Sequence, residues 1–171
     1  MANELLADAF GRVQQSVHAV VDGLAPEQLG FRVDGQTNSI AWLVWHLARV
    51  QDDHLAQAAG TDQVWQAGGW ATRFDLPFQP SATGYGQSAQ DVGTVNVSAD
   101  LLTGYHDAVH ERTLDYVGGL AEDDFARVVD EDWDPPVTLA VRLVSVVNDC
   151  TQHVGQAALV RGIAERAQAA T

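Results

Sequence analysis

The chain has 171 residues, of which 46% are hydrophobic and 19% are charged, a composition typical of a folded globular protein. Nine arginines and no lysine stand against 23 acidic residues, so the formal net charge is −14. Phosphate backbones and anionic membrane surfaces repel such a chain, and we therefore expect neither nucleic acid nor a membrane as its partner. The first ten residues lack the basic start and apolar run of a signal peptide. We expect a cytoplasmic protein.

Apolar residues at intervals of three and four predict four helices, over residues 3–24, 38–59, 98–117 and 138–167. Asn38 or Ser39 is expected to cap the second helix and Thr138 the fourth. Glycines follow the first three helices, as is common at helix ends. No alternating pattern is long enough to build a sheet. The sequence therefore predicts an all-α fold, a four-helix bundle in a single domain that spans residues 1–171.

Two connections in this bundle are unusually long. Residues 60–97 are rich in glycine and aromatic residues, and a segment of this length packs as a lid or carries short helices, which we expect near 64–65 and 88–95. Its aromatic residues Trp65, Trp70 and Phe74 either roof a pocket or simply pack on the bundle. Residues 122–134 are acidic; we interpret them as a solvated loop, with an acidic metal cluster as the alternative.

A polar strip crosses the otherwise apolar fourth helix. Its members follow one another at steps of three and four residues: Arg142, Ser145, Asp149, His153 and Gln156. Buried polar groups without partners cost roughly 1–3 kcal/mol each, so this strip requires partners or a ligand. Asp149 and His153 leave the same face one turn apart, and a carboxylate and an imidazole so placed can bind one divalent metal ion. A third ligand must come from a facing helix.

His46 is the best candidate for that third ligand, because it lies within an apolar run of the second helix. Taken alone, such a histidine is more often a hydrogen-bonded core residue. His106 and His110 are also four residues apart, but their charged neighbours favour a solvated surface over a metal site. His54 is interpreted as a residue at the rim of the bundle. The lone cysteine, Cys150, lies on the apolar side of the fourth helix and is expected to be a buried, unreactive thiol.

Three segments resemble motifs of the DinB-like superfamily. Residues 38–47 (NSIAWLVWHL) are similar to its second-helix motif, residues 152–162 to its fourth-helix motif, and residues 23–29 to its first connection. The resemblance implies an up-down-down-up bundle with a long crossover between helices two and three. It also implies a divalent metal, most often zinc or nickel, held by three histidines. His46 and His153 match two of these, whereas Asp149 stands where the other histidine would be, which changes metal affinity and preference.

Some members of the superfamily use bacillithiol, mycothiol or glutathione, and this chain most resembles the mycothiol-dependent transferases and maleylpyruvate isomerases. The resemblance implies that a metal lowers the pKa of the thiol, whose thiolate then attacks a small electrophile. Arg142 would steady a carboxylate of the thiol or substrate. Relatives are often dimers, so a homodimer is expected.

Two other functions remain open from the residues alone. One is a metal-free bundle that binds a small molecule or a partner. The other is a metal-dependent hydrolase in which Asp52 or Asp53 acts as the base for a bound water.

Overall fold

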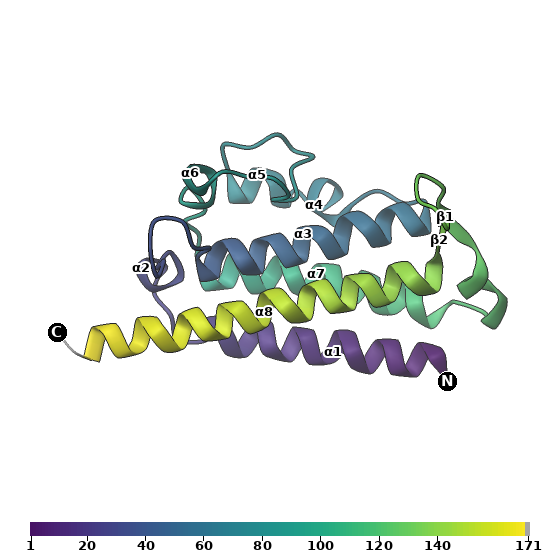
Figure 1. The fold of residues 1–171 in the computed structure, drawn as a ribbon, viewed down its shortest axis with the longest axis horizontal. Coiled ribbons are helices and arrows are strands. Elements are labelled where there is room, and N and C mark those ends of the chain that lie inside the picture. The colour runs from purple at the N-terminus through teal and green to yellow at the C-terminus, as the bar shows by residue number, and fades with distance from the viewer. Residues whose placement is uncertain (170–171) are drawn as a thin grey trace.

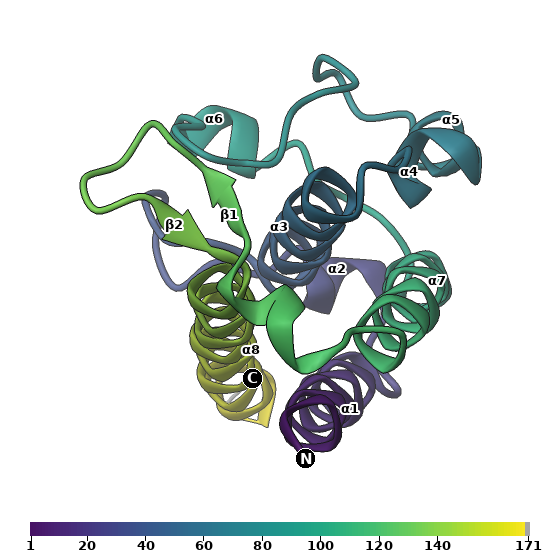
Figure 2. The same cartoon turned by 90° about the vertical axis from the view of Figure 1, so that its right-hand side faces the viewer.

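The fold is given by a computed structural model that describes residues 1–169, apart from the side chain of residue 168. Four long helices lie side by side (Figure 1). They are α1 (Ala2–Val21), α3 (Ile40–Ala59), α7 (Ala99–Gly118) and α8 (Leu139–Ala169). Seen along their length, α3 and α1 occupy opposite corners, with α7 and α8 between them (Figure 2). The prediction of a mostly helical, all-α protein is confirmed.

The helix boundaries follow from local capping chemistry, and each predicted boundary lies within three residues of the observed one. The Ser39 hydroxyl accepts a hydrogen bond from the backbone N–H of Trp42 and caps α3. At its other end, α3 stops at Gly60, whose φ of 66° is a left-handed conformation that glycine adopts without strain. None of the helices within residues 1–169 combines the length and apolarity needed to cross a membrane.

Short elements occupy the connections. The crossover from α3 to α7 carries α4 (Val64–Ala67), α5 (Trp70–Phe74) and α6 (Ala89–Val92), and it lies over α3 (Figure 2). The helices α4 and α6 confirm the expected short helices, whereas α5 was not predicted. The helix α2 (Pro26–Leu29) was not predicted. Between α7 and α8, the 3₁₀ helix η1 (Glu122–Ala126) precedes an antiparallel pair of strands, β1 (Val128–Asp130) and β2 (Val137–Thr138). The expectation that no sheet forms was therefore wrong for this small ribbon.

The acidic connection is largely a solvated segment, as predicted, apart from the half-buried Asp124 and Asp130. Glu122, Asp123, Glu131, Asp132 and Asp134 are exposed, and they form no group of metal-ligating side chains in the part of the chain that the structure describes. Asp130 is half-buried at the end of β1 and pairs with Arg142 of α8. The ribbon therefore rests against the start of α8 through this ion pair.

A buried polar network fixes the crossover to the bundle. The Asp52 carboxylate accepts hydrogen bonds from the backbone N–H groups of Val64 (2.9 Å) and Trp65 (2.7 Å) at the start of α4. It also accepts one from the Tyr105 hydroxyl of α7, at 2.8 Å. The fully buried Arg49 guanidinium lies 3.4 Å from the same carboxylate and donates to the Tyr105 hydroxyl at 3.1 Å. The network ties α3, α4 and α7 together.

The aromatic residues of the crossover pack on the bundle. The ring centroids of Trp65, Trp70 and Phe74 lie 5.0, 5.7 and 5.8 Å from that of Tyr105. All three side chains are buried in the hydrophobic core. Of the two interpretations of these residues, packing on α7 is the one that the contacts support.

Candidate metal centre

The structure brings the three predicted ligands together. His46 comes from α3, and Asp149 and His153 come from α8, the helix on which α3 packs most extensively. One ligand atom of each lies within 4.8 Å of the other two. An ion with bonds of about 2.1 Å holds its donors within about 4.2 Å of one another, so a small closing movement of the side chains suffices. Within residues 1–169, no other three His, Cys, Asp or Glu side chains converge in this way.

Both histidines have the proton arrangement that a metal ligand needs. His46 Nδ1 lies 2.5 Å from the backbone carbonyl oxygen of Thr83, and His153 Nδ1 lies 2.9 Å from that of Asp149. Because a carbonyl oxygen only accepts, each Nδ1 carries the proton and donates it. In the neutral imidazoles, each Nε2 therefore keeps its lone pair for a ligand. Backbone acceptors of this kind commonly orient metal-binding histidines.

Asp149 supplies the clearest indication of a cation. Its Oδ2 atom is buried and has no hydrogen-bond partner. His153 Nδ1 lies 3.3 Å from it but directs its proton to the backbone carbonyl. Leaving a buried carboxylate oxygen unpaired costs free energy, and a cation at this position would remove that cost. Two imidazoles and one carboxylate thus fit a divalent ion such as zinc or nickel.

The electrostatics of His46 and Asp149 favour the forms that bind metal, whereas those of His153 favour its protonated form. Burial lowers the pKa of His46, against the opposing effect of the Thr83 hydrogen bond. Burial acts to raise the pKa of Asp149, but His153 and the other nearby histidines lower it below its usual value. The contact with the Asp149 carboxylate raises the pKa of His153, against the effect of burial. At neutral pH the carboxylate is ionised and His46 is neutral.

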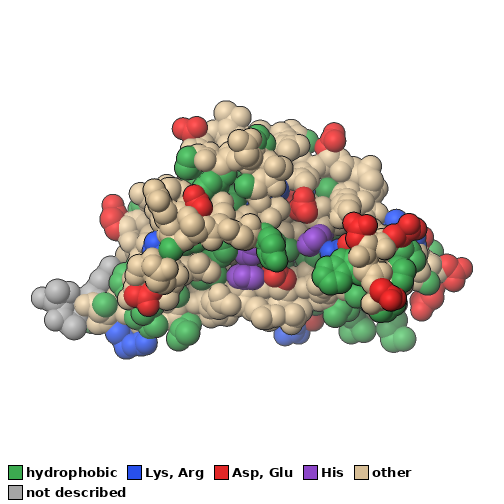
Figure 3. Space-filling model, turned by 45° about the horizontal axis from the view of Figure 1, so that its top comes forward, with side chains coloured by type: hydrophobic (Ala, Val, Ile, Leu, Met, Phe, Trp, Pro, Cys, Tyr) green, Lys and Arg blue, Asp and Glu red, His purple; other side chains and the backbone are tan. Residues whose placement is uncertain are grey.

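The cluster reaches the protein surface. The His46 side chain is nearly buried, whereas those of His153 and Asp149 are 19% and 33% exposed. Figure 3 shows histidine side chains in the middle of one face, with acidic and hydrophobic side chains around them. The cluster therefore lies at the edge of the bundle, where parts of the His153 and Asp149 side chains meet solvent.

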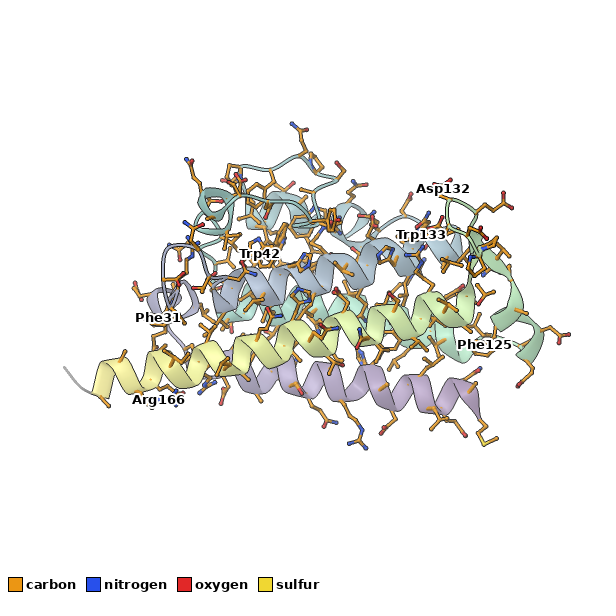
Figure 4. All side chains as sticks on the ribbon, viewed as in Figure 1. Phe31, Trp42, Phe125, Asp132, Trp133 and Arg166 are labelled. Carbon is orange, nitrogen blue, oxygen red and sulfur yellow. The ribbon has the colours of Figure 1, made fainter. Side chains whose placement is uncertain are left out.

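Sequence reasoning missed the groups that surround His46. The Trp42 ring stacks on the His46 ring, with centroids 4.6 Å apart and planes 14° apart. Figure 4 shows Trp42 on the side of α3 that faces the crossover. The buried backbone of Gly84 lies against the Nδ1 side of the imidazole, next to Thr83. Trp42 lies one turn from His46, and its helical spacing was a usable signal, but nothing in the sequence pattern marked Thr83 or Gly84.

Arg142 lies at the end of the site near the strands. Its guanidinium forms an ion pair with Asp130, Nη2 to Oδ2, and Nη1 donates to His54 Nδ1 at 3.3 Å. His54 is half-buried, as the rim position predicted, and burial followed by the Arg142 charge lowers its pKa. Arg142 is thus already engaged with two residues, and its contact with a thiol stays a prediction.

The interpretation of His106 and His110 as a solvated surface was wrong. His106 is fully buried and His110 is 7% exposed. Their charged neighbours Glu111 and Arg112 do face solvent, because each helical residue turns the side chain by about 100° from the last. The two histidines lie on the opposite, inner face of α7. They take part in no group of three metal-ligating residues within the described residues.

Cys150 lies in the apolar environment that its position on the fourth helix predicted. Its side chain is fully buried, and its thiol donates to the Leu47 carbonyl at 3.6 Å. Burial, and to a lesser extent the Asp149 charge, raises the pKa of this thiol far above its usual value. Cys150 therefore supplies neither a nucleophile nor a metal ligand.

A helical bundle with a His₂Asp cluster between two of its long helices defines a class of candidate metalloproteins. Comparison with known proteins makes this specific. A family model described as mycothiol-S-transferase matches residues 5–165, and the chain belongs to this family, which confirms the resemblance to DinB-like proteins. The crystal structure of a conserved protein from Enterococcus faecalis matches with a TM-score of 0.87 and 26% sequence identity, covering 92% of this chain and 94% of that one. No curated protein matches the chain.

Proposed function

We propose that this protein is a divalent-metal-dependent enzyme that transfers a low-molecular-weight thiol of the mycothiol type to a small electrophile. His46, Asp149 and His153 hold the metal, and zinc or nickel suits this donor set. The observation that carries the proposal is the convergence of the three donors around Asp149 Oδ2, a buried atom that accepts no hydrogen bond. The family match supports the thiol as co-substrate.

Each residue of the site has a distinct part in this function. His46 and His153 present Nε2 lone pairs because Thr83 and Asp149 carbonyls accept the Nδ1 protons. The Asp149 carboxylate supplies negative charge from a half-buried position. A metal held by only these three protein ligands would keep a position open for the thiol and would lower the pKa of that thiol, so that the thiolate would form at neutral pH. Arg142 is proposed to steady a carboxylate of the thiol or electrophile.

The proposal includes the finer architecture that the resemblance implied. We take residues 1–171 as one domain located in the cytoplasm, with its long helices in up-down-down-up order. Figure 1 supports this order, since α1 and α8 both begin at the end of the bundle that carries β1 and β2. The match of the family model to residues 5–165 supports a single domain.

A homodimer also belongs to the proposal. An apolar groove of about 360 Å³ runs where α1 and α8 meet, lined in part by Leu5, Leu6 and Val147. Two large apolar side chains at this face, Leu5 and Val144, are 69% and 63% exposed. Exposed apolar patches of this kind are typical of protein interfaces.

The hydrolase alternative has less support. Both oxygens of Asp52 already accept hydrogen bonds, from the backbone N–H groups of Val64 and Trp65. Asp53 accepts from the Gln63 amide. Asp52 faces α4 and α7, whereas His46 faces α8. Neither carboxylate is thus placed as an uncommitted base beside the donor cluster.

The test combines metal analysis with a thiol-transfer assay on protein purified without a histidine tag. After zinc loading and gel filtration, we expect close to one zinc per chain in the wild type, and a large loss in H46A, D149A and H153A. H18A is the matched control, because His18 is exposed and pairs with Asp107 on another face. Zinc-loaded wild type should conjugate mycothiol to monochlorobimane. A wild type that retains no zinc or nickel would contradict the proposal.

A further inference from the structure

One segment of the crossover is bound to three successive turns of α3. Side chains of α3 hydrogen-bond to residues 82–87, and the middle contact involves the candidate ligand His46. These bonds run from Trp42 Nε1 to Gln87 Oε1 (2.7 Å), from His46 Nδ1 to the Thr83 carbonyl (2.5 Å) and from Arg49 Nε to the Ala82 carbonyl (3.1 Å). The segment therefore docks on the same face of α3 that presents His46.

Gly84 allows this docking to be close. A Cβ atom at residue 84 would lie 2.6 Å from His46 Nδ1 and within 3.0 and 3.1 Å of the Trp42 and Trp45 rings. These are packed rings and not the free ends of flexible chains, so a side chain at residue 84 must push either the imidazole or the segment away. The φ of Gly84 is 100°, a conformation that residues with a side chain rarely adopt.

We infer that Thr83 and Gly84 form the positioning element of the metal ligand His46, and that metal binding is coupled to the docking of residues 82–87 on α3. This inference rests on the proposed function. The Thr83 carbonyl holds the proton on Nδ1 and fixes the plane of the ring, and Gly84 permits the approach that makes this hydrogen bond. By linkage, a change that undocks the segment weakens metal binding, and metal binding strengthens the docking by the same factor.

The chain offers a matched pair of variants for the test. G84A places a methyl group against His46. G86A is the control, because Gly86 also has a positive φ, 72°, but has no heavy atom within 4 Å of a Cβ position. Both variants strain the same segment, and only G84A displaces the imidazole.

Affinity is measured with Co²⁺ through its visible absorption bands, and with Zn²⁺ by competition against a chelator. We expect G84A to bind both ions about 10–100-fold more weakly than the wild type, the usual effect of losing a group that orients a ligand. G86A is expected to retain the affinity and the Co²⁺ spectrum of the wild type. A G84A variant that binds both ions as tightly as the wild type would overturn the coupling. A wild type that binds neither ion would instead overturn the proposed function.

Hydrogen exchange on the wild-type chain gives a second test that needs no variant to fold. Zinc should slow amide exchange across residues 82–87 and leave α6, residues 89–92, unchanged. Unchanged exchange in residues 82–87 at zinc saturation would overturn the inference, whatever the behaviour of G84A.

Discussion

His106 and His110 stack on the inner face of α7, with ring centroids 6.4 Å apart and planes 13° apart. Neither nitrogen of His106 has a hydrogen-bond partner, and His110 Nδ1 has none either. Burial, followed by the His110 charge, lowers the pKa of His106 to about 3. Burial also lowers the pKa of His110. Both rings are therefore neutral in the folded protein and titrate near pH 6.5 once the chain unfolds.

This pair makes stability depend on pH in a defined direction. Between pH 6.5 and about 3 the unfolded chain binds more protons than the folded one, so the free energy of unfolding is fully retained above pH 6.5 and declines as the pH falls. The decline per group approaches about 1.4 kcal/mol per pH unit. Urea unfolding of metal-free wild type and H106L at pH 7.5 and 5.5 checks this. The wild type should lose more stability than H106L, and parallel losses would contradict the assignment.

Asp149 is expected to set metal affinity through its charge. D149N keeps the size of the side chain but removes the carboxylate. Because losing a group that only supports a ligand typically weakens metal binding about 10–100-fold, the loss of a ligand itself should weaken zinc binding by at least that factor. D149H restores the three-histidine set of the superfamily and should retain zinc. Competition against a chelator measures both, with N148A as an exposed neighbouring control. Tight zinc binding by D149N would remove Asp149 from the ligand set.

The Arg49 network is expected to contribute strongly to stability. R49A leaves the Asp52 carboxylate buried without its cation, a loss that typically costs about 3–5 kcal/mol. Y105F removes one hydroxyl from the same network and should cost about 1–3 kcal/mol. Urea unfolding gives both values, with R12A as control because the Arg12–Asp8 pair is exposed. If R49A and R12A are equally stable, the network does not hold the crossover.

Arg142 is expected to act on thiol binding and not on metal binding. R142Q removes a charged hydrogen-bond donor. Losing one hydrogen bond to a charged group should raise the KM for mycothiol about tenfold and change kcat little. Its zinc content should equal that of the wild type and of R161Q, a control that bonds to α1. An unchanged KM would show that Arg142 only joins α8 to β1.

The homodimer should depend on the groove between α1 and α8. V144D places a charge on its exposed apolar rim, and light scattering after gel filtration should then report a monomer where the wild type is a dimer. L159D is the control, since Leu159 is 64% exposed on the same helix but lines a different groove. Dissociation by L159D alone would assign the interface to that other groove.

Sequence alone predicted that Asp149 and His153 lie on one side of the fourth helix, because residues four apart on a helix point in nearly the same direction. Asp149 and His153 are four residues apart on one helix, and the structure places both side chains beside His46. The ends of α3 were also predictable, since the Ser39 hydroxyl caps its first turn and Gly60 adopts the left-handed conformation that ends it. Periodicity and capping are properties of neighbouring residues, and so they were visible without coordinates.

The supporting contacts were not predictable for the same reason. Thr83 and His46 are 37 residues apart in the sequence, and no repeating pattern records such a contact. Asp52 finds its partners among backbone N–H groups of α4, which any sequence would supply. His106 was misjudged because its charged neighbours point away from it around the helix axis.

The shielding of Cys150 has a consequence for the proposed reaction with electrophiles. Soft electrophiles alkylate accessible sulfur and amine nucleophiles, yet this sequence holds one cysteine and no lysine. The cysteine lies fully inside the bundle with its proton retained. Under the proposed function, the electrophile therefore cannot inactivate the chain through this thiol, and iodoacetamide should leave Cys150 unlabelled in the folded protein and label it in urea.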